Sequence, residues 1–169
     1  MPRADLVADC ASCAALCCVA PSFEVSEDFA IAKAAGEPCP HLTHGFRCTI
    51  HDHLAARGFS GCAIYTCYGA GQRATAVCAG QPVSTTHAAF LALRALHEML
   101  WLLTEAARLV PASRPDLAAA LSSRIDALDA LAKRPPATWI EVRARALRQD
   151  TDALLRQVGD ALGGRQGRP

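Results

Sequence analysis

The chain has 169 residues, of which 51% are hydrophobic and 20% charged, and its formal net charge at pH 7 is +1. This composition is too apolar and too neutral for a natively disordered protein. It also argues against duplex DNA as the main partner, because a net charge this close to zero does not attract a polyanion. All nine cysteines lie between Cys10 and Cys78.

The ends and the apolar stretches of the chain bear on its compartment. The first twenty residues contain Asp5, Asp9 and four cysteines, and they lack the uninterrupted apolar core of a signal peptide. The longest apolar stretch, residues 91–110, is interrupted by charged side chains, so no membrane span is predicted. We therefore expect a cytoplasmic protein, in which clustered cysteines favour metal ligands or redox thiols over disulfides.

Residues 1–80 are predicted to form a loop-rich cysteine-cluster segment. Short helices are expected at the first cysteines and over residues 50–57, and the glycines of residues 69–71 are expected in a turn. This segment has too few large apolar residues to build a core of its own. Bound metal is therefore expected to hold it together.

Residues 81–164 are predicted to form an antiparallel three-helix bundle, followed by a frayed tail over residues 165–169. The whole protein is thus expected to be mainly α-helical, with the cysteine-cluster segment packed on the bundle. Trp101 and Trp139 are expected in the bundle core. The apolar faces could instead pair with a second copy of the chain or with a protein partner.

Capping signals set the expected boundaries of these three helices. A side-chain N-cap followed three residues later by an acidic residue predicts a helix start, and a glycine pair predicts an end. The first helix is expected to start at residues 84–86 and to end at Val110. The second is expected to start at Ser113 with Asp116. The third is expected to start at Thr138 with Glu141 and to end at Gly163 and Gly164.

The spacing of the cysteines predicts metal binding. Two residues separate Cys10 from Cys13, which lets two thiolates converge on one ion, and Cys17 adds a third thiol in the same local run. The side chains of the vicinal residues Cys17 and Cys18 are expected to point in different directions. This geometry disfavours the binding of one tetrahedral ion by both thiols. Isolated buried cysteines often serve only as small apolar residues, but nine within 69 residues favour ligation.

The identity of the metal is open at this point. Structural zinc usually has two paired knuckles, whereas only Cys10 and Cys13 have that form here. Iron–sulfur clusters often combine a local run with a remote Cys-Pro, which Cys39-Pro40 fits, and this slightly favours a cluster over zinc. Mixed ligation is open through four histidines, which are His41, His44, His51 and His53.

The cysteine run C-x2-C-x3-C-C, followed by Cys39-Pro40, resembles the bacterial cysteine-cluster family described as zinc- or iron-chelating. The segments DCASCAALCCVA, FRCTIHDHLAARGFSGC and CYGAGQ, with LHEMLWLLTEA later in the chain, look like the N-terminal region of actinobacterial pentapeptide-repeat proteins. The resemblance covers roughly residues 5–165. Those relatives continue into pentapeptide repeats, which do not occur in this sequence, so no role of the repeats is transferred.

The resemblance implies a ligand set of eight cysteines, with Cys78 outside the shared motif and expected to pack. Eight thiols would suit two tetrahedral ions, or one cluster and one ion. Some relatives of the C-x3-C-C type are methyl-transferring enzymes with an iron–sulfur cluster. The implied metal ligands are Cys10, Cys13, Cys17, Cys18, Cys39, Cys48, Cys62 and Cys67.

A metal-binding protein is the first function that these patterns predict. The second is an iron–sulfur-dependent redox or group-transfer enzyme, with catalytic candidates Tyr65, Tyr68, His51 and Asp52. The third is a thiol redox or metal-handling protein in which neighbouring cysteines exchange. The sequence leaves open whether any reaction is catalysed.

Overall fold

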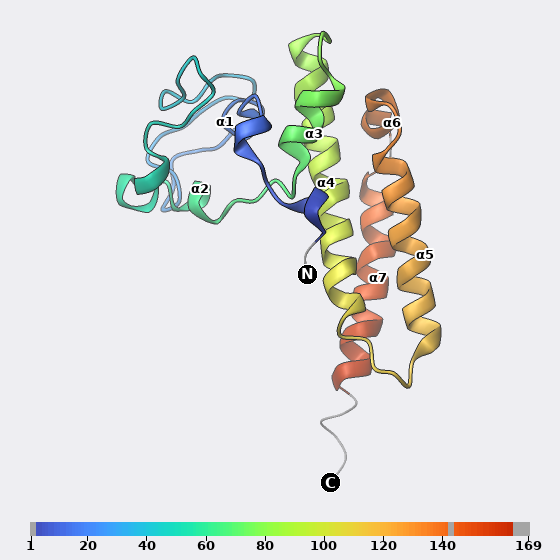
Figure 1. Ribbon diagram of the computed structural model, residues 1–169. Helices are drawn as coiled ribbons and strands as arrows, with labels where there is room; N and C mark the ends of the chain where they lie inside the picture. Colours follow the sequence, from blue (N-terminus) through green and yellow to red (C-terminus); the bar gives the residue numbers. More distant parts are fainter. Residues whose placement is uncertain (1–2, 142–143, 164–169) are drawn as a thin grey trace. The chain divides into compact units, whose positions relative to one another are not determined.

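The computed structural model describes residues 3–141 and 144–163. Its fold is mainly α-helical, as predicted (Figure 1). Within these residues the only extended pairings are two isolated antiparallel bridges, Phe23 with Lys33 and Leu42 with Cys48. None of the described helices combines the length and the apolar character that a membrane crossing requires.

The chain divides into two compact units, Met1–Arg94 and Ala95–Pro169. The division falls inside α4 (Val83–Ala107) and not near residue 80, where the composition changes. The first turns of α4 belong to the cysteine-rich unit because the Arg94 guanidinium lies over two aromatic rings of that unit. It is 5.2 Å from the centroid of Tyr65 and 6.0 Å from that of Tyr68.

The first unit consists of short helical turns joined by loops, followed by the first turns of α4. Its small core includes Leu6, Leu16, Phe59, Phe90, Leu93 and several alanines, as expected from its low content of large apolar residues. The helical elements are η1 (Ala4–Leu6), η2 (Cys10–Ser12), α1 (Leu16–Val19), η3 (His51–His53), η4 (Ala55–Arg57), α2 (Ser60–Ile64) and α3 (Ala70–Val77).

The turn predicted for residues 69–71 is wrong for Gly71, which lies inside α3. Gly69 alone adopts the turn conformation, with a φ of 77°, and caps the helix. A Cβ at Gly69 would also collide with the carbonyl oxygen of Asp5. Helix α3 escaped prediction because the residues of AGQRATAV are mostly small or polar and show no apolar period.

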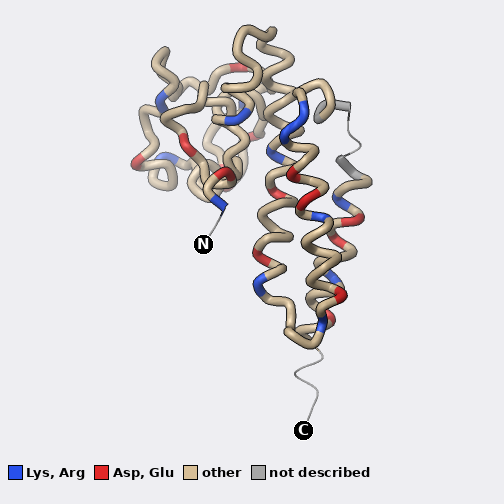
Figure 2. Tube along the Cα trace, turned by 45° about the vertical axis from the view of Figure 1, so that its right-hand side comes forward, with Lys and Arg blue, Asp and Glu red and all other residues tan. Residues whose placement is uncertain are grey.

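The second unit contains the end of α4 together with α5 (Pro115–Ala132), α6 (Pro136–Glu141) and α7 (Ala144–Gly163). Helix α5 packs against α6 and α7, and both views show the end of α4 running beside them (Figures 1 and 2). A 3.5 Å ion pair between Glu98 and Arg148 joins α4 to α7. The buried side chains are Leu96, Met99, Leu100, Leu103, Leu117, Leu121, Leu128, Thr151 and Val158.

The predicted caps of these helices are wrong. Helix α4 starts at Val83, so Ser84–Thr86 lie in its first turn, where the Thr86 hydroxyl donates back to the Pro82 carbonyl at 3.4 Å. The N-cap position of α5 is Arg114 and not Ser113, and no side chain caps it. The Arg114 guanidinium instead donates to the Asp116 carboxylate at 2.7 Å.

The third predicted helix is two helices, α6 and α7. Helix α6 already starts at Pro136, whose fixed φ suits the first turn, so Thr138 lies inside it and not at a cap. Helix α7 ends at Gly163, as predicted. The side chain of Trp139, residue Gly164 and the predicted tail 165–169 lie outside the described parts.

Candidate metal centre

The loop that carries Cys10 and Cys13 is shaped by its own residues. The Asp9 carboxylate caps η2 by accepting from the Ala11 amide at 2.9 Å and from the Ser12 hydroxyl at 2.6 Å. Ala15 follows in the left-handed conformation, with a φ of 53°, and α1 begins directly after it. The three thiols of the local run therefore lie on one tight turn.

Helix α3 clamps this turn from the other side through two polar side chains. Gln72 donates to the Val7 carbonyl at 2.7 Å and accepts from the Asp9 amide at 3.2 Å. The Thr75 hydroxyl accepts from the Ala14 amide at 3.0 Å. No role was predicted for Gln72 and Thr75, although Gln72 closes the CYGAGQ segment that carries part of the resemblance.

Four thiols line one small cavity between this turn and α3. The cavity has a volume of about 20 Å³ and is lined by Cys10, Cys13, Cys17, Cys67, Asp9, Gly71, Gln72 and Phe90. A Cβ placed on Gly71 would lie 2.7 Å from the Cys13 sulfur and 3.7 Å from the Cys67 sulfur. The missing side chain of Gly71 thus leaves room for the two sulfurs to approach each other across α3.

The other four predicted ligands do not line this cavity. Two of them are held together by the backbone, since the Cys39 amide donates to the Cys18 carbonyl at 3.0 Å. Cys48 lies on the bridge with Leu42, and Cys62 is exposed in α2. The ninth, Cys78, is buried with 4% exposure at the end of α3.

The neighbouring thiols of Cys17 and Cys18 lie closer together than predicted. Their sulfurs are 3.9 Å apart, because the single helical turn after Ala15 brings both to one side. A tetrahedral ion with metal–sulfur bonds of about 2.3 Å separates its sulfurs by about 3.8 Å. The expectation that this pair points in different directions is therefore wrong.

Three thiols that line the cavity, those of Cys10, Cys13 and Cys17, have raised pKa values. Burial is the main cause for Cys10 and Cys13, and at Cys10 the charges of the neighbouring thiols add to it. At Cys17 the main cause is its hydrogen bond with Cys18, followed by burial. A raised pKa favours the protonated thiol, which is a weaker nucleophile than the thiolate.

Metal affinity should therefore fall steeply with acidification. Each of the three thiols with a raised pKa must lose its proton before it can bind, so binding of one ion releases about three protons from them. We expect affinity for zinc to weaken by about 1,000-fold per pH unit between pH 8 and 6, from about three protons released. Competition with a chromophoric chelator measures this, and an affinity independent of pH would show that the thiols are not ligands.

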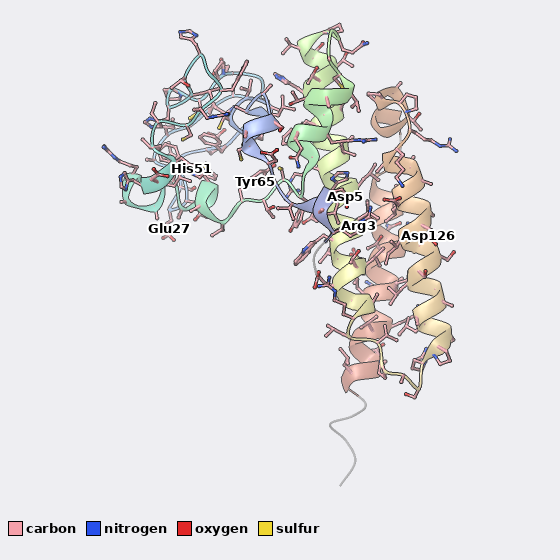
Figure 3. The ribbon with its side chains drawn as sticks, viewed as in Figure 1. Arg3, Asp5, Glu27, His51, Tyr65 and Asp126 are labelled. Atoms are coloured by element: carbon pink, nitrogen blue, oxygen red, sulfur yellow. The ribbon has the colours of Figure 1, made fainter. Side chains whose placement is uncertain are left out.

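The side chains proposed for mixed ligation or catalysis lie elsewhere in the unit. His41 packs edge-on against Phe59 at 5.1 Å between ring centroids. His51 Nδ1 lies 3.6 Å from Asp52 Oδ1, and both side chains are largely exposed. Figure 3 labels His51 on η3. Tyr65, whose pKa is raised to about 12, mainly by burial, follows α2. His44 and His53 are exposed.

The thiols do not converge fully on one point. Within residues 3–141 and 144–163, no group of three or more His, Cys, Asp or Glu side chains lies close enough together to hold a metal ion. Ligation by the cavity thiols would need rotation of the cysteine side chains. Such rotations move a sulfur without moving the backbone that positions it.

Lys33 fixes the loop that carries Cys39. Its side chain is buried, with 6% exposure, and its ammonium donates to the carbonyls of Val19, Ala34 and Glu37 at 2.8 to 3.0 Å. Burial lowers its pKa, while the nearby Cys39 and Cys18 oppose that effect. This role of Lys33 could not be predicted from the sequence, because the acceptors of its hydrogen bonds are backbone carbonyls.

Replacing Lys33 by methionine should destabilise the first unit by about 3 kcal/mol, since hydrogen bonds from charged groups contribute about 1.5–3 kcal/mol each and are not additive. Urea unfolding followed through the tyrosine signal measures this. Lys133→Met is the matched control, because that side chain is 68% exposed in a surface pair with Asp129 and should change stability by less than about 0.5 kcal/mol. Equal effects of the two substitutions would contradict the role of Lys33.

Comparison with known proteins gives one informative match. The chain is 40% identical over 110 residues to the uncharacterized protein YybG of Bacillus subtilis (strain 168), which covers 60% of this chain and 39% of that protein. The chain thus spans well under half the length of this relative. No family model matches the sequence, and no solved structure matches it.

Proposed function

We propose that the protein binds a metal through cysteine thiolates, with a zinc ion or an iron–sulfur cluster held at the four-thiol cavity. The observation that carries this proposal is that Cys10, Cys13, Cys17 and Cys67, which come from two distant parts of the chain, line one cavity. Packing alone does not require four polar sulfurs to face a shared space. The resemblance to the cysteine-cluster family supports the same ligands.

The size of the cavity favours a single ion over a cluster. A volume of about 20 Å³ holds roughly one water-sized body. A zinc ion fits this space once the thiols rotate inward, whereas an iron–sulfur cluster would require the turn and α3 to separate. We therefore favour zinc, and this reverses the slight preference for a cluster drawn from Cys39-Pro40.

The proposal includes a structural role for the metal. Bound metal would hold the loop-rich segment in place, and the docking of that segment on an antiparallel three-helix bundle is part of the same proposal. Pairing through the apolar helix faces with a second copy or a protein partner stays a prediction.

The double substitution Cys13→Ser with Cys67→Ser tests the ligand assignment. It removes one thiol from each part of the chain that lines the cavity, and we expect the purified chain to carry at least one metal equivalent less than the wild type. Cys78→Ala is the control, because it removes a buried thiol outside the cavity and should leave the metal content unchanged. A double variant with the full metal content would contradict the proposal.

A further inference from the structure

We infer that a second pocket of the first unit binds a small carboxylate with an apolar body. The pocket has a volume of about 610 Å³, within the range of about 300–1,000 Å³ that is typical of sites for small organic ligands. It shares no lining residue with the four-thiol cavity, so the inference goes beyond the proposed metal site. Its apolar lining includes Leu16, Val19, Leu42, Phe46, Cys78 and Val83.

The walls of this apolar pocket come from separate segments of the first unit. One wall is a short hairpin in which Leu42 pairs with Cys48, and another combines the end of α3 with the first turns of α4. Leu16 of α1 and Cys78 at the end of α3 also line the pocket, and both are buried. The deep part of the pocket is therefore apolar and suits a hydrocarbon or aromatic group.

Phe46 is held at the opening of the pocket in a strained conformation. Its φ is 58°, in the left-handed region that bulky side chains rarely adopt. Its amide donates to the Thr43 carbonyl at 3.1 Å, and the Arg47 guanidinium donates to the carbonyls of Phe46 and Cys10 at 3.3 and 3.0 Å.

This strained residue does not contribute to the core, because Phe46 is 52% exposed. Val83, which lines the same pocket from α4, is 69% exposed. Backbone strain at residues other than glycine clusters at ligand-binding sites, where it positions a side chain for a partner. The two exposed side chains offer a ligand apolar surface to bury.

The polar side chains of the pocket favour an anionic head group. Two imidazoles line it, that of His44 from the hairpin and that of His87 from α4. Neither imidazole forms a hydrogen bond or an ion pair with another residue in the described parts of the chain. The described lining contains no Asp, Glu, Lys or Arg. An imidazole N–H donates to a carboxylate and attracts it when protonated, whereas no lining carboxylate is present to offset a cation.

Calorimetric titration of the full chain with decanoate, decanol and decylamine tests the inference. The three probes share one hydrocarbon chain and differ in the head group. We expect decanoate to bind about 10-fold more tightly than decanol, because a hydrogen bond to a charged group contributes about that factor. A wild-type chain that binds none of the probes, binds decanol as tightly as decanoate, or binds decylamine most tightly would overturn the inference.

The double substitution His44→Leu with His87→Leu should abolish the preference for decanoate over decanol. The matched control is His51→Leu with His53→Leu, since both of these imidazoles are exposed on η3 and neither lines the pocket. The control should keep the preference. A preference that survives in the pocket variant, or that is lost equally in both, would contradict the assigned head-group site. The ranking of the probes by the wild type decides the matter even if a variant fails to fold.

Metal content, measured on the same samples, separates this inference from the proposed function. A chain with bound metal and no preference for decanoate would overturn the carboxylate site alone. A chain that prefers decanoate and carries no metal would support the carboxylate site and contradict the metal site.

Discussion

Replacing Gly71 by alanine is expected to weaken metal binding by about 100-fold, near the upper end of the effects seen for residues that orient metal ligands. The new methyl group would lie 2.7 Å from the Cys13 sulfur and 3.7 Å from the Cys67 sulfur. The first distance is far below van der Waals contact, so Cys13 must turn away from the cavity or α3 must shift. Either response separates ligands from opposite sides of the site.

This expectation runs against simple helix propensity. Gly71 lies within α3, where alanine would ordinarily stabilise a helix by about 1 kcal/mol. Gly159 offers the matched control, because it lies within α7 and a Cβ there would meet nothing within 4 Å. Gly159→Ala should therefore raise the free energy of unfolding by up to about 1 kcal/mol and leave metal affinity unchanged.

Zinc affinity, measured by chelator competition on both variants, gives the comparison. Weaker binding in Gly71→Ala alone supports the cavity as the site. Unchanged binding in Gly71→Ala would show that the Cys13 and Cys67 sulfurs need not approach each other, and it would count against the four-thiol site.

Removal of the metal is expected to unfold the first unit and leave the second folded. Structural zinc contributes on the order of 10 kcal/mol or more in small metal-stapled modules, which exceeds the stability of a typical domain. The core of Met1–Arg94 has few large apolar side chains, whereas that of Ala95–Pro169 is lined by leucines. The first unit is therefore expected to depend on a bound metal far more than the second.

The aromatic residues make this separation measurable. Both tyrosines, Tyr65 and Tyr68, lie in the first unit, and both tryptophans, Trp101 and Trp139, lie in the second. A chelator should abolish the near-ultraviolet tyrosine signal and open residues 3–80 to proteolysis, while tryptophan fluorescence stays unchanged.

A variant of the second unit supplies the reverse control. Leu128 is 1% exposed in α5, so Leu128→Ala should cost about 2–5 kcal/mol and shift the tryptophan transition, leaving the metal content intact. A tyrosine signal and protease resistance that survive complete removal of the metal would contradict a structural role for it.

The ligands that are close to one another in the sequence were easier to predict than the ligand that comes from a distant segment. Cys10, Cys13 and Cys17 fall within one turn, so their spacing alone indicates that they can converge. Cys67 joins them only because Gln72 and Thr75 fasten α3 to that turn, and such contacts between remote segments leave no periodic signal. Only the resemblance to a known family pointed to Cys67.

Helices were predicted correctly where apolar residues recur at helical spacing over many residues, but the positions of most helix ends were predicted incorrectly. Three leucines of α5 recur at helical spacing and are buried, since Leu117, Leu121 and Leu128 are each at most 1% exposed, whereas Leu131 near the end of the helix is half-buried. The cap at Ser113 failed because Arg114 and Asp116 satisfy each other across the first turn, and this pairing is not distinguishable from ordinary surface charge in the sequence.

Metal analysis of the full chain purified without oxygen, with an absorption spectrum recorded alongside, tests the central claim most directly. We expect bound metal in every molecule, and a colourless zinc protein is the expected form. Iron with equimolar sulfide and visible absorption would still support thiolate ligation, and it would identify the bound group as an iron–sulfur cluster instead of zinc. A chain without metal, in which the eight cysteines other than the buried Cys78 react freely with a thiol reagent, would contradict this role of the thiols.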